Sequence, residues 1–143
     1  MAHTPTPEIR AYFDQRLLAA IPSLEITTDQ VAWFNTPFSP NVDEPYLEPF
    51  ILYSPTVPTS FGDDGFEQLS GLYQINVQHV KGQGAGPAER IARDLVDEFR
   101  GGQRHEADCF TLIIRTAYSG NPVSDNDRLF TPVSVVWLAY VQK

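Results

Sequence analysis

Three glycines, Gly82, Gly84 and Gly86, lie between a strand-like run and a helix-like run, in the position where nucleotide-binding proteins carry their phosphate loops. A Walker loop needs lysine and then serine or threonine after its last glycine, but Pro87 follows Gly86 here. The dinucleotide fingerprint G-x-G-x-x-G would place its third glycine at Pro87 as well. The sequence therefore predicts a turn rather than a nucleotide site.

The run HEADC, from His105 to Cys109, contains residue types that could bind a metal ion or act as a nucleophile. Neighbouring residues of an extended chain point in alternate directions, and no second cluster at zinc spacing completes a site. Cys109, the only cysteine, fits a small hydrophobe at a strand start, and His79 fits a core residue on the apolar side of its strand. We predict that the chain has no catalytic residue, no metal site and no cofactor, and that it is not an enzyme. An enzyme built around His105 and Cys109 is the competing hypothesis.

Charge and composition narrow the classes of partner. The 143 residues carry 10 Lys and Arg against 18 Asp and Glu, a net charge of −8. The basic residues are few and scattered, which argues against tight binding to nucleic acid, whereas an acidic surface suits DNA that passes without sticking. No apolar run approaches the roughly 20 residues of a membrane helix, so we expect no membrane partner. A single cysteine fits synthesis in the cytoplasm.

Periodicity predicts two helices and four main strands in a single domain, residues 1–143. The first helix starts near Thr6-Pro7-Glu8, and the second follows the glycines with one apolar face. Between these elements, residues 54–71 read as a long polar loop. The predicted strands cover residues 46–53, 72–80, 109–118 and 130–141. We therefore expect an α+β fold, with a mainly antiparallel sheet of four to five strands and two helices packed on one face.

The last two strands carry large apolar residues on both of their faces. Val135 and Trp137 alternate with Val136 and Leu138, for example. Two helices cover only one face of such a sheet, so apolar surface should remain exposed and serve as an interface. A fully buried central strand, or cover from the long loops, is the alternative.

In the order of its elements, the chain resembles the small tail terminator proteins of long-tailed bacteriophages and prophages. These proteins are also called tail-completion or minor tail proteins. The resemblance covers nearly the full length and is carried by IRAYFDQRLLAAIP, by GLYQINVQHVKGQGAGPAERIARDLVDEFRGG and by VSVVWLAYV. It implies a structural virion protein that self-associates into a ring, commonly a hexamer, on the end of the tail tube. The ring stops tube polymerisation and offers a joining surface to the head-completion (connector) proteins, and DNA passes through its channel without specific binding. The implied partners are thus the chain itself, the tail tube protein and the head-completion protein. The implied location is the virion tail, after assembly in the cytoplasm of a bacterial host.

The polar loop from Thr59 to Gln68 is where we expect some of these contacts. Its apolar anchors would be Phe61 and Phe66, and its charges would be Asp63, Asp64 and Glu67. The competing function is a monomeric binding module that uses an exposed sheet face for a peptide or a small ligand.

Overall fold

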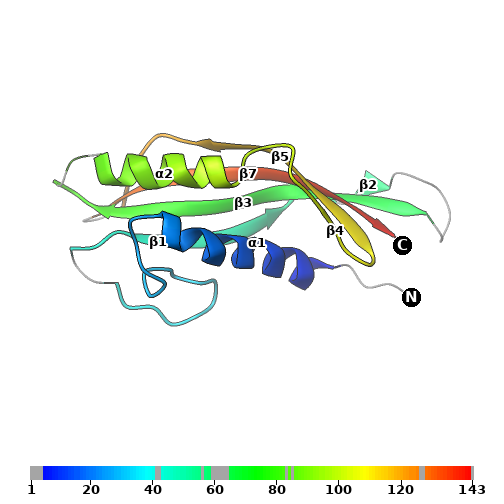
Figure 1. The fold of residues 1–143 in the computed structure, drawn as a ribbon, viewed down its shortest axis with the longest axis horizontal. Coiled ribbons are helices and arrows are strands. Elements are labelled where there is room, and N and C mark those ends of the chain that lie inside the picture. The colour runs from blue at the N-terminus through cyan, green and yellow to red at the C-terminus, as the bar shows by residue number, and fades with distance from the viewer. Residues whose placement is uncertain are drawn as a thin grey trace.

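A computed structural model describes residues 5–40, 43–55, 57–58, 65–82, 84, 86–125 and 128–142. Within them, two α-helices accompany one antiparallel sheet, which confirms the expected α+β class (Figure 1). None of the described helices has the length and apolarity required to span a bilayer. The elements are, in chain order, α1 (Thr6–Ala20), the short 3-10 turn η1 (Ile21–Ser23), β1 (Tyr46–Tyr53), β2 (Val57–Pro58), β3 (Phe66–Val80), α2 (Gly86–Glu98), β4 (Arg104–Glu106), β5 (Phe110–Ser119), β6 (Val123–Asp125) and β7 (Arg128–Gln142).

The sheet has seven strands in the described residues. Five of them follow the order β1-β3-β7-β5-β4, and every pairing between them is antiparallel. The short strands β2, β4 and β6, which pair with β3, β5 and β7, were not predicted. The sequence predicted a charged loop where β4 lies, and four to five strands in all. The two long strands β3 and β7 thus form the centre of the sheet, and β1 and β4 form its edges.

Strand β3 begins at Phe66, whereas the sequence predicted a strand from residue 72 preceded by a long loop. The prediction of a loop through residue 71 was therefore wrong for residues 66–71. Serine and glycine in this stretch disfavour a strand locally, but β7 supplies a full hydrogen-bonding partner from Phe66↔Gln142 onward. Leu69 is buried on this extension. In Figure 1, β2 and the adjoining end of β3 project beyond both helices.

Helix α1 buries the face that its periodicity predicted. Ile9, Phe13 and Leu17 are all fully buried. The Phe13 ring stacks on the Tyr73 ring of β3 with centroids 4.8 Å apart, and it lies 6.0 Å from the Trp137 ring of β7. Full burial of such side chains stabilises the fold by about 1.5–3 kcal/mol each, so this aromatic cluster anchors α1 to the two central strands.

Helix α2 packs on the same face of the sheet, beside α1. Its residues Ile91 and Leu95 are buried, and Phe99 just beyond its end lies 6.3 Å from Phe13 between ring centroids. The Arg16 guanidinium of α1 donates a hydrogen bond to the backbone carbonyl of Glu98 at 2.9 Å, which ties the two helices together. The expectation of two helices on one face is thus confirmed. The buried sheet residues beneath them are Tyr73, Ile75, Val77, Leu112, Ile114, Val133, Val135, Trp137 and Ala139.

Candidate functional site

The glycine loop forms the turn between β3 and α2. Gly82 and Gly84 have φ angles of 87° and 76°, values that favour glycine, and both are exposed. Strand β3 runs antiparallel to both neighbours, β1 and β7, whereas a dinucleotide site requires parallel strands. Pro87, in the first turn of α2, also lacks an N–H for an anion. The geometry supports the turn that the sequence predicted.

The HEADC run is divided between a strand and a turn. His105 lies in β4, and its ring stacks on the Tyr12 ring of α1 at 4.5 Å. Cys109 directly precedes β5 and packs against the core, but it is half-buried, whereas the sequence predicted a buried small hydrophobe. Among the residues that the structure describes, no group of three or more His, Cys, Asp and Glu side chains is arranged to hold a metal ion. Among the described residues, His105 and Cys109 therefore have structural neighbours and no catalytic partner.

His79 is a core residue, as its place on the apolar side of β3 predicted. It is 8% exposed, and its Nε2 lies 3.4 Å from Thr131 Oγ1, whereas its Nδ1 has no hydrogen-bond partner among the described residues. Burial lowers the pKa of His79 below the ordinary value of 6.5, because a charged imidazolium would lose its hydration there. The neutral ring is the form that this position stabilises.

The sequence did not predict a polar contact between α1 and the sheet. The hydroxyl of buried Tyr73 donates a hydrogen bond to Asp14 Oδ1 at 2.6 Å. Burial is the main cause that raises the pKa of Asp14, while Tyr73 and Arg10 oppose the rise. Burial, followed by the nearby Asp14 charge, raises the pKa of Tyr73 far above 10. The spacing of Asp14 on the α1 face toward the sheet was the only sequence signal for this pair.

Of the five predicted interface residues, the structure describes two. Phe61, Asp63 and Asp64 lie outside the described residues. Phe66 and Glu67 are the first residues of β3, where Phe66 is half-exposed and Glu67 is paired across to Val141. Whether these residues contact a partner stays a prediction.

The sheet face opposite the helices carries a contiguous apolar surface, here called the open-face patch. Strand alternation and register place its residues in neighbouring rows. One row is Leu52↔Leu72↔Val136, and the next is Ile113↔Leu138. Both described helices pack on the other face, so this surface is partly exposed, as the sequence predicted. Leu52, Tyr118 and Tyr140 are exposed, and the other members are half-buried. The open-face patch consists of Leu52, Leu72, Ile113, Tyr118, Val136, Leu138 and Tyr140.

The other end of this face is polar and closely packed. The sequence predicted a half-buried strand with Asn76 and Gln78 on its polar side, yet they are only 7% and 4% exposed. Gln78 lies between Tyr46 and Phe130 in the register, and these large neighbours shield it from water. Asn76 Nδ2 donates to a Glu48 carboxylate oxygen at 3.3 Å. The open-face patch therefore ends at a polar boundary.

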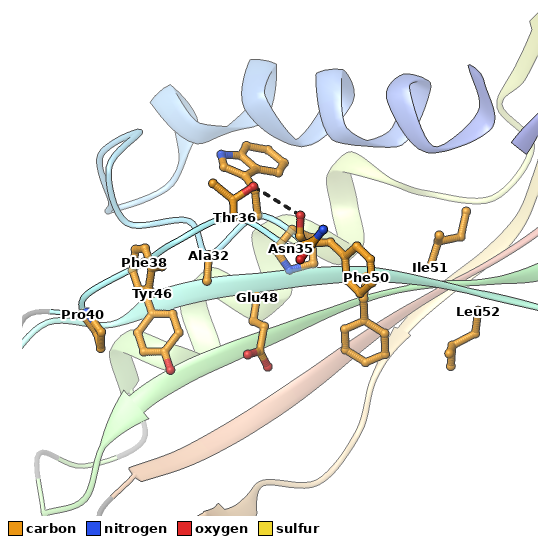
Figure 2. A pocket seen from close by; sticks show the side chains of 13 residues that line it. Ala32, Asn35, Thr36, Phe38, Pro40, Tyr46, Glu48, Phe50, Ile51 and Leu52 are labelled. Carbon is orange, nitrogen blue, oxygen red and sulfur yellow. Dashed lines mark hydrogen bonds between the residues drawn. The ribbon is translucent and has the colours of Figure 1, made fainter. Parts of the chain in front are cut away.

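A groove of about 570 Å³, here called the β1 groove, runs between residues 32–40 and β1 (Figure 2). Five of its described lining residues are aromatic, and Glu48 is the only charged one among them. In Figure 2, Glu48 and Leu52 point to one side of β1 and Ile51 points to the other. The aromatic lining residues are Trp33, Phe34, Phe38, Tyr46 and Phe50. The groove is thus apolar and lies beside a sheet edge, which suits a peptide chain better than a small charged ligand.

Comparison with known proteins identifies the family. A family model described as phage tail terminator protein matches residues 8–137. The chain belongs to the phage tail terminator family. A tail terminator is a structural protein of the phage tail, so the chain is a virion tail component. Membership in this family further implies that it oligomerises and interacts with tail and head components.

One solved structure, which carries no functional name, shares the fold of this tail terminator with a TM-score of 0.73 and 26% sequence identity. The match covers 99% of this chain and 98% of the other. A search of curated proteins found no match. The resemblance that the sequence analysis drew from the two helices and the closing strand is thereby confirmed at the level of the family.

Proposed function

We propose that this tail terminator forms a ring, commonly a hexamer in such proteins, on the end of the tail tube. The ring stops tube polymerisation and presents a surface to the head-completion protein. The open-face patch supports this proposal, because it is an apolar surface that no described helix covers. In a family whose members oligomerise, such a surface suits a contact between subunits. The net charge of −8 suits a channel through which DNA passes without binding.

The size of the open-face patch fits a subunit or tube contact. Tyr118 and Tyr140 are 51% and 39% exposed. With roughly 200 Å² for a whole aromatic side chain, these two alone expose about 180 Å². A standard interface takes about 800 Å² from each partner, so these two rings would supply roughly a fifth of one and the other patch residues would add to it. The same surface could serve the competing monomeric binding module, and the measurement of assembly separates the two functions.

The contact residues of the β3 extension belong to the same proposal. Phe66 and Glu67 stand where β3 projects beyond the helices, a position that can reach a neighbouring subunit or the tube. We propose that they join the residues Phe61, Asp63 and Asp64 of the preceding segment in this contact. Charge reversal at Glu67 should then weaken tube capping without changing the free energy of unfolding.

The test compares two leucines with equal exposure. Leu52 in the open-face patch and Leu18 on the outer side of α1 are both 47% exposed. In Leu52→Asp, a carboxylate would have to be buried at the contact, and a cost of about 3 kcal/mol would weaken association roughly a hundredfold. Leu18→Asp should leave association unchanged. Light scattering over a concentration range and electron microscopy with tail tubes measure both.

A wild-type protein that remains monomeric at all concentrations and never caps tubes would overturn the ring. Equal capping by the two aspartate variants would instead show that the open-face patch is not the contact.

A further inference from the structure

The outer edge of β1 is only partly occupied. On the side away from β3, the Leu47 N–H donates to the Gln30 carbonyl at 2.9 Å, and the Ala32 N–H donates to the Leu47 carbonyl at 2.7 Å. This short parallel bridge is centred on Val31↔Leu47, and the chain then leaves the edge. Strand β1 therefore already accepts one strand-like partner along its first residues.

The remaining outer positions of β1 can be assigned from the alternation of an antiparallel ladder. Because Leu47 directs its backbone groups outward, Pro49, Ile51 and Tyr53 do so as well. The inward bond from Ser54 N–H to the Ser70 carbonyl, at 2.8 Å, agrees with this assignment. Proline has no N–H, so Ile51 and Tyr53 are the two outer positions with both a donor and an acceptor. In the described part of the chain, no backbone hydrogen bond reaches these groups from outside the sheet.

The β1 groove lies beside these free groups. Its aromatic lining offers contacts for the alternate side chains of an extended segment, and its one carboxylate, Glu48, favours a positive charge next to them. Free backbone groups along an edge together with an apolar groove are the features by which a sheet takes up an added strand.

The opposite edge of the same sheet offers a matching strand. On either side of β4, the Gln103 carbonyl accepts a hydrogen bond from the Ile114 N–H and the Ala107 N–H donates to the Phe110 carbonyl, each at 2.9 Å. By alternation, Arg104 and Glu106 direct their backbone groups outward. These two residues have the same two-residue spacing as Ile51 and Tyr53. The exposed Arg104 also lies on the open side of the sheet, the side of Glu48. Within one chain its guanidinium pairs with Glu106 at 3.0 Å, and at the contact between copies it would share this pairing with Glu48.

We propose that the β4 edge of one copy pairs with the β1 edge of the next copy at Ile51 and Tyr53, so that the sheet continues from subunit to subunit. This contact joins two different surfaces of the same chain, and such contacts generate rings when the rotation closes. The inference rests on the proposed function, in which copies of the chain assemble on the tail tube.

Proline substitution tests the β1 edge. In Ile51→Pro the outward N–H is lost while the ladder to β3 is kept, and Pro49 shows that proline is accepted at this parity. The matched control Ile51→Ala loses the same buried side chain but keeps the N–H. We expect Ile51→Pro to weaken assembly at least tenfold relative to Ile51→Ala, as measured by light scattering and by capping of tail tubes. Glu106→Pro against Glu106→Ala should behave in the same way on β4.

Amide hydrogen exchange of the wild-type protein gives a second readout that does not depend on a variant's folding. The amides of Ile51 and Tyr53 should exchange quickly in the monomer and become protected in the assembly. A wild-type assembly in which these amides still exchange quickly, or in which Ile51→Pro caps tubes as well as Ile51→Ala, would overturn strand pairing and leave the ring intact. A wild-type chain that never assembles would overturn both.

Discussion

Replacing Gly71 with alanine should reveal how tightly β1, β3 and β7 are packed where the β3 extension begins. Gly71 lies between Tyr53 of β1 and Trp137 of β7. A Cβ at this position would stand 2.0 Å from the backbone carbonyl oxygen of Leu52 and 3.1 Å from Trp137 Cζ2. Carbon and oxygen normally approach no closer than about 3.3 Å, so the clash is with backbone that cannot rotate away.

The magnitude follows from the shift that is required. The Leu52 carbonyl must retreat by about 1.3 Å from β3, whose spacing to its neighbour is about 4.8 Å. Overpacking of this kind costs about 1–3 kcal/mol, and each ladder hydrogen bond that breaks costs about 1 kcal/mol more. The lower entropy of the unfolded alanine chain offsets about 0.4–1 kcal/mol. With one ladder hydrogen bond broken, we expect Gly71→Ala to lower the free energy of unfolding by about 1–4 kcal/mol.

Urea unfolding measures this change, with Gly86→Ala as the matched control. At Gly86 the nearest atom to an added Cβ is the flexible Arg90 Nη1 at 3.4 Å, and the residue opens α2. The control should unfold within about 1 kcal/mol of the wild type. If the two alanine variants were equally stable, the close packing of Gly71 against Leu52 would be refuted.

Two further predictions concern pH. The pKa of Tyr73 is raised in the folded state, so above about pH 10 the unfolded chain releases a proton that the folded chain retains, and stability falls by up to about 1.4 kcal/mol per pH unit. Tyr73→Phe should flatten this alkaline loss, and equal slopes in urea unfolding would contradict it. The pKa of His79 is lowered in the folded state, so the unfolded chain binds more protons as the pH falls through about 6.5. The wild type should therefore lose more stability between about pH 7.5 and about pH 5.5 than His79→Leu does, and parallel loss in both would count against a neutral, buried imidazole.

The buried faces of the helices and strands could be predicted because each depends on local periodicity. Ile9, Phe13 and Leu17 recur at helical spacing, and their burial follows wherever the helix finds a sheet. The strand from Tyr46 to Tyr53 was predicted with its bounds. The exposed apolar side of the sheet also followed from the sequence, since two helices cannot cover both faces.

The features that were missed depend on pairing between distant segments. The start of β3 at Phe66 depends on the partner strand around Gln142, and no local pattern specifies that partner. The burial of Gln78 depends on the large side chains of Tyr46 and Phe130 on the neighbouring strands. The sequence predicted Gln78 to face solvent because local alternation does not show which side chains lie on the neighbouring strands.

The sequence alone determined the α+β class, the turn chemistry of the glycine loop and the resemblance to tail terminators, because periodicity, proline and glycine act over a few neighbouring residues. Only the tertiary structure decided which backbone groups lie at a sheet edge. The outward groups of Ile51 and Tyr53, which have no partner among the described residues, and the aromatic β1 groove arise from strand order. A residue's place at an edge or in the centre is set by strands far away in the chain.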